Sequence, residues 1–143
     1  MIGDYAKPKT RLPGGGGAPE IASSCGQIFI TMKQSKRGMV EAIDFVTSFG
    51  HGQGPEARAK LGLTTKGPTL LITDLAVWKT DPETGEFVVA SLHPGVTRAQ
   101  VTETCGWTPS FAETVEETPP PTDLELTTLR DLKARTAAAH GKA

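Results

Sequence analysis

The chain has 143 residues, the length of one ordinary domain, and its 37% hydrophobic and 22% charged residues are typical of a globular protein. A formal net charge of −1 leaves no basic field that could hold a phosphate backbone, so we expect no nucleic-acid partner. No apolar run reaches about 18 residues, and the first residues lack the form of a signal peptide, so we expect no membrane association and a cytoplasmic location.

The first part of the chain combines an irregular start with one helix and one strand. Residues 1–17 contain prolines and show no apolar period, which indicates an irregular lead-in that ends in four consecutive glycines. A helix is predicted at 18–25, because Pro19 suits a first turn and Glu20 complements the positive end of the helix dipole. The alternating apolar residues of 27–33 predict a strand.

A long glycine-rich connection occupies the middle of the chain. Residues 39–47 suit either a helix or a strand, and we favour a strand because they run directly into glycines. Residues 48–67 include a short predicted helix at 55–60, and structureless connections of this length are often functional. The nearly continuous apolar run 68–77 predicts one strand that is buried on both faces of a sheet.

A hairpin and a capped helix come next. The turn residues of 79–86 predict a hairpin that returns as a strand over 87–93. Thr97 and Gln100 have the spacing of a capping box, which predicts a short helix at 98–105.

The end of the chain predicts one more strand and one more helix. The strand is expected at 110–117, and three prolines then separate it from a helix over 122–139 that begins at Thr122 or Asp123. The order of elements indicates an α/β or α+β architecture, and we expect residues 1–143 to form a single domain. Four leucines should give the last helix one apolar stripe: Leu124, Leu126, Leu129 and Leu132.

The four glycines at 14–17 are the sharpest candidate for a site. A backbone without side chains lets a ligand approach the N–H groups before a helix, where an anion or a developing oxyanion can be held. The sequence is neither a P-loop nor a dinucleotide-binding fingerprint, because the required spacing is absent. From the residues alone, a ligand cradle and a flexible turn are equally good interpretations.

Histidines and cysteines offer weaker signals. His51 stands between two glycines and could be a general base or ligand clamp, although a solvent-facing loop histidine is the favoured interpretation. Cys25 and Cys105 belong to no CxxC pair, so we interpret both as packed thiols. His51, His93 and His140 show no metal-ligand spacing, and we expect no metal site.

Two long stretches resemble the β subunits of the family I CoA-transferases. The run PGGGGAPEIASS at 13–24 is similar to their glycine loop, and it continues through a strand to the TSFG at 47–50. The run from GPTLLITDL at 67–75 through the LHPGV at 92–96 to the CGW at 105–107 is similar to their paired strands, turn and helix. The resemblance covers about residues 3–133 and is strongest to a branch that includes glutaconate CoA-transferase β subunits and a steroid-ring-opening CoA hydrolase.

The resemblance implies an open, mostly parallel α/β sheet with flanking helices, in a subunit that pairs with a CoA-transferase α subunit, for example as α₂β₂. The substrates would be acyl-CoA thioesters and carboxylates, with coenzyme A as the group transferred. The residues carried over to the thioester site are those of the glycine loop and the helix start: Gly14, Gly15, Gly16, Gly17, Ala18 and Glu20.

This sequence departs from the family at the nucleophile. The family uses a glutamate in a Ser-Glu-Asn-Gly motif that lies before the glycine loop, and no such motif occurs in the 143 residues. We therefore expect a C-terminal half of a β subunit that lacks its N-terminal half, and a chain that is inactive alone. The alternatives are the β subunit of a ring-opening thioester hydrolase and a non-catalytic interaction subunit.

Overall fold

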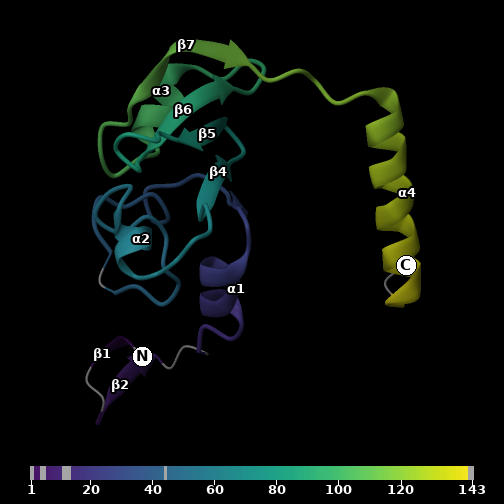
Figure 1. Cartoon of the computed structure of the whole chain (residues 1–143). Helices are drawn as coiled ribbons and strands as arrows, with labels where there is room; N and C mark the ends of the chain where they lie inside the picture. The colour runs from purple at the N-terminus through teal and green to yellow at the C-terminus, as the bar shows by residue number, and fades with distance from the viewer. Residues whose placement is uncertain (1, 4–5, 11–13, 44, 142–143) are drawn as a thin grey trace.

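Five strands form the sheet at the centre of the computed structural model, which describes residues 2–3, 6–10, 14–43 and 45–141 (Figure 1). Their order across the sheet follows the sequence: β3 (Ile28–Thr31), β4 (Pro68–Ile72), β5 (Ala76–Thr80), β6 (Phe87–Leu92) and β7 (Phe111–Glu117). The flanking helices are α1 (Ala18–Ser24), α2 (Ala57–Lys60) and α3 (Arg98–Glu103). The predicted helices and strands at these places are confirmed, apart from the differences described below.

The sheet is mixed. The outer pairs β3–β4 and β6–β7 are parallel, and each is joined by a long crossover, whereas the inner pairs β4–β5 and β5–β6 are antiparallel. The expected open α/β sheet with flanking helices is confirmed. It is not mostly parallel, because two short turns fold β4, β5 and β6 into consecutive hairpins, and such turns join only antiparallel strands.

The hydrophobic core lies on one face of this sheet. Leu71, Trp78 and Val89 are direct cross-strand partners and therefore point to the same face, where Val101 of α3 packs against them. Trp78, Val89 and Val101 are completely buried. On the opposite face, the side chain of Phe29 in edge strand β3 is 55% exposed, so this face is only partly covered within the described residues.

The apolar run 68–77 folds as two strands instead of the one that was predicted. Thr73 Oγ1 accepts hydrogen bonds from the N–H groups of Leu75 (3.2 Å) and Ala76 (3.0 Å), which closes a tight turn after β4. The next residue, Asp74, accepts a hydrogen bond from the Gln34 N–H at 2.7 Å and so ties the turn to the end of β3. The sequence pattern does not predict this turn, because apolar residues flank it and its only local signal is the polar pair Thr73 and Asp74.

The strand favoured at 39–47 is wrong. Met39 is buried, but the apolar side chains of Ile43, Phe45 and Val46 are 65%, 59% and 58% exposed. The described residues of this segment form bends and irregular backbone instead. A strand needs a sheet face for alternate side chains, and no face of the described structure receives these three. Residue 44 lies outside the described residues.

The lead-in is more regular than expected. Of residues 1–17, Ile2–Gly3 forms strand β1 and pairs antiparallel with β2 (Pro8–Thr10) in a separate two-stranded ladder. The expectation of an irregular segment is therefore wrong for these residues, whereas 1, 4–5 and 11–13 lie outside the described residues.

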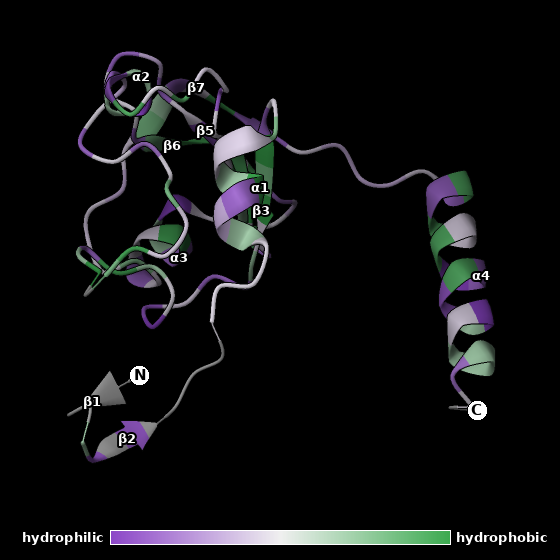
Figure 2. Cartoon of the chain, turned by 60° about the horizontal axis from the view of Figure 1, so that its bottom comes forward, coloured by the Kyte–Doolittle hydropathy of each residue, from purple (hydrophilic) through white to green (hydrophobic). Residues whose placement is uncertain are grey.

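The C-terminal helix α4 (Asp123–Ala139) stands apart from the body in both views (Figures 1 and 2). It begins where predicted, because Thr122 and Glu125 form a reciprocal capping box. The three prolines at 119–121 lie in the extended segment that separates α4 from β7, and proline-rich segments are stiff.

The four leucines of α4 do not form the one apolar stripe that was predicted. At about 100° per residue they spread over roughly 200° of the helix circumference and form a broad band. No residue of α4 is buried.

Within the described residues, no helix is long and apolar enough to cross a lipid bilayer.

Replacement of Trp78 should test the position of the core. Trp78→Ala removes a completely buried indole that contacts the Trp107 ring at a centroid distance of 6.4 Å, and should cost about 3–5 kcal/mol of unfolding free energy. Leu124→Ala in the exposed α4 is the control and should change it by less than about 0.5 kcal/mol. Urea denaturation measures both, and equal losses would contradict this core.

Asp74→Asn should flatten the acid limb of the stability–pH profile. The pKa of the Asp74 carboxyl lies below its ordinary value of 3.8, chiefly because the Gln34 N–H donates to the carboxylate. A lowered folded-state pKa gives stability that is present above the unfolded value and is lost as pH falls through the folded value. Urea midpoints measured between about pH 5 and pH 2 should fall more steeply for the wild type than for the variant. Parallel profiles would show that this hydrogen bond does not contribute.

Candidate functional site

The glycine loop runs directly into α1. Gly17 is the N-cap residue and offers no capping side chain, and Pro19 and Glu20 lie in the first turn as predicted. Only Gly16 among the four glycines has a positive φ, +57°, a conformation that other residues rarely adopt. A Cβ on Gly14, Gly16 or Gly17 would meet nothing within 4 Å, so the backbone there is open on the side where a ligand could approach.

Gly15 is the residue of the loop that has close neighbours. A Cβ added to it would lie 3.3 Å from the ring of Pro19 and 3.8 Å from Cβ of Thr47. The glycine loop therefore lies beside the end of the segment that carries the exposed Ile43, Phe45 and Val46. Ala18 and Glu20 are exposed beside it.

His51 lies in the wall of a groove and is held by its Nε2 atom. Nε2 is 2.6 Å from the carbonyl oxygen of Pro68 at the start of β4, and a carbonyl oxygen can only accept a hydrogen bond. Nε2 therefore carries the hydrogen, and in the neutral ring Nδ1 is left as an acceptor. No group in the described part of the chain is hydrogen-bonded to His51 Nδ1.

Arg58 joins three segments around this wall. The residue is only 4% exposed, and its guanidinium donates to the carbonyl oxygens of Ala22 in α1 (3.0 Å), Gly50 (3.0 Å) and Thr65 (3.0 Å), and to Thr65 Oγ1 at 2.6 Å. No carboxylate of the described residues forms an ion pair with it. The charge is satisfied by backbone dipoles, which fixes the helix after the glycine loop, the turn before His51 and the entry to β4 relative to one another.

Gly67 makes room for this arrangement. Its φ is +71°, and an added Cβ would lie 2.9 Å from Cζ of Arg58. The glycine before β4 is thus required by the buried guanidinium.

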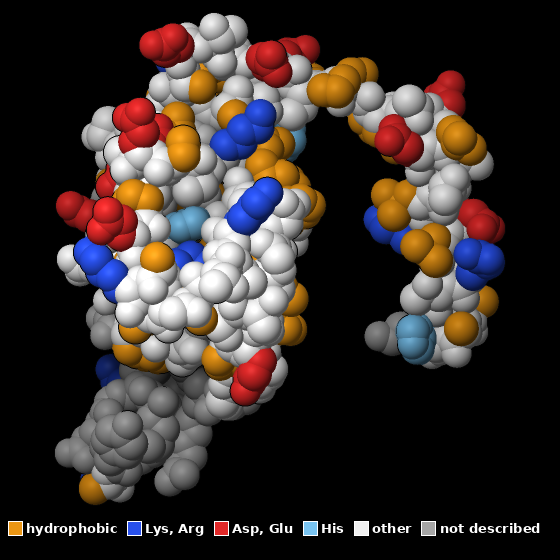
Figure 3. Space-filling model, viewed as in Figure 1, with side chains coloured by type: hydrophobic (Ala, Val, Ile, Leu, Met, Phe, Trp, Pro, Cys, Tyr) orange, Lys and Arg blue, Asp and Glu red, His pale blue; other side chains and the backbone are white. Residues whose placement is uncertain are grey.

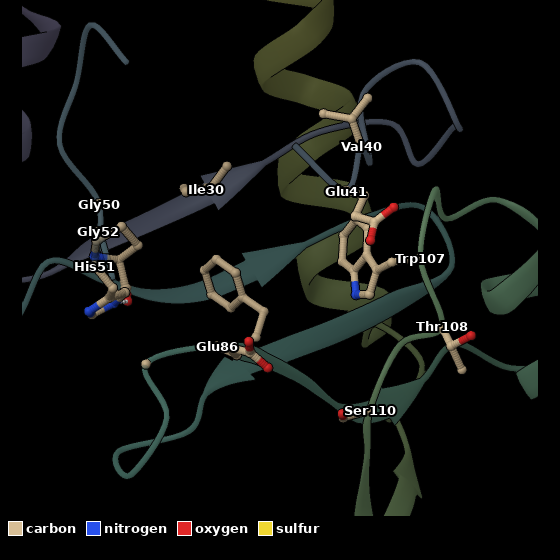
Figure 4. A pocket seen from close by; sticks show the side chains of 13 residues that line it. Ile30, Val40, Glu41, Gly50, His51, Gly52, Glu86, Trp107, Thr108 and Ser110 are labelled. Atoms are coloured by element: carbon tan, nitrogen blue, oxygen red, sulfur yellow. Dashed lines mark hydrogen bonds between the residues drawn. The ribbon is translucent and has the colours of Figure 1, made fainter. Parts of the chain in front are cut away.

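A groove with a volume of about 580 Å³ lies beside His51 on the described surface (Figure 4). Its walls come from β3, the segments at 40–41 and 50–52, and the approaches to β6 and β7. Volumes of this size are typical of small-molecule sites. The polar and aromatic side chains around it are His51, Glu41, Glu86, Phe87, Trp107, Thr108 and Ser110.

The structure does not bring all the predicted site residues together. His51 lines the groove, but Gly14–Gly17, Ala18 and Glu20 are not among its lining residues. Glu41, Glu86 and Trp107 line it and were not singled out from the sequence. Glu41 and Glu86 are 45 positions apart and share no motif, so only the fold could show that both line one groove.

His93, Cys105 and Cys25 lie outside the lining of the groove. Both ring nitrogens of His93 are hydrogen-bonded, Nδ1 to Thr118 Oγ1 and Nε2 to the Thr73 carbonyl oxygen. Cys105 is buried, which raises the pKa of its thiol, whereas Cys25 is exposed and the prediction of a packed thiol is wrong for it. The described residues contain no group of three or more histidine, cysteine or acidic side chains that could hold a metal ion.

Most of the chain matches the model of one protein family. The family model described as "Coenzyme A transferase" matches residues 1–104, well over half of the chain. The chain belongs to the coenzyme A transferase family. The resemblance inferred from the glycine loop and the paired strands is confirmed.

Two curated relatives and one crystal structure agree with this membership. The B-type subunit of 3-oxoadipate CoA-transferase from Pseudomonas knackmussii is 56% identical over 142 residues, 99% of this chain and 55% of that protein. The B-type subunit of glutaconate CoA-transferase from Acidaminococcus fermentans is 39% identical over 87% of this chain and 47% of that protein. The crystal structure of glutaconate CoA-transferase from the same organism superposes with a TM-score of 0.78 over 90% of this chain and 49% of its own, at 35% identity.

The superposition confirms a CoA-transferase-like α/β fold. The chain spans about half the length of the curated relatives that it matches.

Replacement of Arg58 should loosen the groove wall. Arg58→Met would leave several buried carbonyl oxygens without a donor and should cost at least about 2 kcal/mol of unfolding free energy. Lys60→Met, on the same short helix, removes an exposed ion pair with Glu56 and should cost less than about 0.5 kcal/mol. Chemical denaturation compares the two, and a loss for Arg58→Met as small as that for Lys60→Met would show that the guanidinium does not hold these segments.

Proposed function

We propose that the chain is part of the β subunit of a heteromeric CoA-transferase that moves coenzyme A from an acyl-CoA thioester to a carboxylate. The observation that carries this proposal is the 56% identity to the B-type subunit of 3-oxoadipate CoA-transferase, which extends over 99% of the chain. Both curated relatives are transferases by name, so the alternatives of a ring-opening hydrolase and a non-catalytic subunit have less support.

The acids named for the two relatives suggest a substrate class. 3-Oxoadipate and glutaconate are both short dicarboxylic acids. We therefore propose a short dicarboxylate and its CoA thioester as the substrate pair.

The glycine loop is the part of the thioester site that this chain would supply. Backbone N–H groups at an open loop before a helix can donate to an oxygen that gains negative charge when a nucleophile attacks the thioester. Gly14–Gly17 have that open backbone, and Ala18 and Glu20 begin the helix behind them. Because no Ser-Glu-Asn-Gly sequence occurs here, the glutamate nucleophile would come from a part of the active enzyme outside these 143 residues.

A CoA-transferase α subunit is the partner that we propose, in an α₂β₂ or larger assembly. The exposed Ile43, Phe45 and Val46 support a protein contact here, because adjacent large apolar side chains rarely face water without a partner. Thr47, which follows Val46 in the chain, lies beside Gly15 of the loop, so a partner protein seated on this segment would approach the proposed thioester site.

A chimaeric β subunit tests the function without requiring the chain to act alone. In the Pseudomonas knackmussii relative, the matched segment is replaced by this chain, and the product is co-expressed with the α subunit of that same enzyme. We expect an assembled complex that exchanges CoA between a dicarboxylate and its thioester, measured by mass spectrometry of the CoA esters. A complex that assembles normally but shows no exchange would contradict the proposal.

The role of the loop is tested by two glycine variants of the same chimaera. Gly16→Val forces a branched residue into a positive φ and should lower the exchange rate at least about 10-fold. Gly26→Val, outside the loop, is the matched control, because its surroundings are equally open and its φ is not positive, and it should stay within about twofold. Equal effects of the two variants would remove the loop from the site.

A further inference from the structure

A second, smaller cavity lies next to the groove and shares His51, Pro68 and Gly85 with it. This small cavity has a volume of about 370 Å³ and is lined by α2, by residues of 63–69 and by the hairpin turn after β5. We propose that it binds a zwitterionic amino acid with an aliphatic side chain. The inference goes beyond the proposed transferase and does not depend on it.

Two opposite charges line the small cavity from neighbouring strand ends. Lys66 precedes β4 and Asp81 follows β5, and because these strands are antiparallel, both residues lie at the same end of the sheet. The ion pairs of the described residues do not include one between Lys66 and Asp81. A molecule that carries both an ammonium and a carboxylate group can satisfy the two charges at once.

Lys66 is the cation that remains available to a ligand. Arg58 also lines the cavity, but its guanidinium makes five hydrogen bonds, to four backbone carbonyl oxygens and to the hydroxyl of Thr65, and so uses all its N–H groups. The side chain of Lys66 is exposed and forms no ion pair with the described residues. A carboxylate in the cavity would therefore be bound by Lys66.

Asp81 is the group that would bind the ammonium. Its Oδ1 accepts hydrogen bonds from the N–H groups of Glu83 (2.8 Å) and Thr84 (2.9 Å). The pKa of the Asp81 carboxyl lies below its ordinary value of 3.8, chiefly because the Thr84 N–H donates to it, so the group is ionised at neutral pH. A carboxylate has about four lone-pair sites, which leaves capacity for an ammonium donor.

The rest of the lining selects the side chain of the ligand. The apolar walls come from Pro55, Ala59, Leu63 and Pro82. A volume of about 370 Å³ is within the range of small-molecule sites and has room for an amino acid such as leucine.

Mixed charge on this surface disfavours a ligand of one sign. Acidic and basic side chains lie close together around α2 (Figure 3). A dicarboxylate has no group that can pair with Asp81 and would meet like charge there, whereas a simple amine would meet Lys66. The zwitterion is the ligand that leaves neither charge opposed.

Binding can be followed by NMR on the intact, ¹⁵N-labelled chain during titration with L-leucine. The amide signals of Lys66, Thr80 and Asp81 should shift saturably by about 10 mM leucine. The amide signal of Leu132 in α4, which does not line the cavity, should stay in place.

Two analogues of leucine separate its charges. 4-Methylpentanoate lacks the ammonium group, and 3-methylbutylamine lacks the carboxylate. Each should bind at least about 10-fold more weakly than leucine, because one charge of the cavity then stays unpaired. Glutarate is the dicarboxylate probe and should also bind at least about 10-fold more weakly.

Variants identify the groups that bind. Asp81→Asn keeps an Oδ1 acceptor for the turn but loses the charge, so leucine affinity should fall at least about 10-fold while 4-methylpentanoate affinity does not fall. Lys66→Gln should weaken leucine about 5-fold and leave 3-methylbutylamine unchanged. Glu83→Gln and Lys79→Gln are the charge controls, because both residues are exposed and lie outside the lining, and each should stay within about twofold.

The titrations decide the proposal in both directions. No saturable shift of the three cavity amides, an analogue or glutarate that binds as tightly as leucine, or a wild-type leucine affinity in Asp81→Asn would overturn it. Because the titrations use neither coenzyme A nor a partner subunit, an inactive chimaera would leave the amino-acid site standing. Equally, a failed leucine titration would leave the transferase function standing.

Discussion

A buried guanidinium holds the candidate site together. Arg58 is almost completely buried, yet its hydrogen bonds go to backbone carbonyl oxygens and one threonine hydroxyl instead of a carboxylate. Those acceptors belong to the helix after the glycine loop, to the turn before His51 and to the entry of β4. A charge that is desolvated in this way is stable only while all three segments stay in place. The positions of the glycine-loop helix and of the groove wall at His51 therefore depend on one side chain.

Most of the helices and strands could be predicted from the sequence, but the burial of Arg58 and its hydrogen bonds could not. Local signals were sufficient for α1, α3 and α4, because prolines, capping boxes and turn residues act within a few positions of one another. Arg58 lies in a short helix that was predicted, but nothing in its neighbours indicates that it is buried, since its acceptors are backbone atoms that no residue type encodes. The same holds for Glu41 and Glu86, which line one groove only because the sheet brings distant segments together.

Two of the failed predictions equate apolar content with a strand. Apolar residues predict a strand at 39–47 and a single strand at 68–77, but a side chain is buried only where another surface covers it. In the first case Ile43, Phe45 and Val46 remain exposed beside the glycine loop. In the second case Thr73 closes a turn inside an apolar run. Exposed apolar residues at a candidate site are consistent with a surface that another protein chain covers, as in the proposed heteromer.

Native-state hydrogen exchange measures most directly whether Arg58 joins the glycine-loop helix and the entry to β4 into one unit. The account predicts that the hydrogen-bonded amides of Ile21, Cys25 and Lys66 open with a common free energy, and that Arg58→Lys lowers it at all three together. Independent opening energies in the wild type, or a loss confined to α2 in the variant, would contradict it.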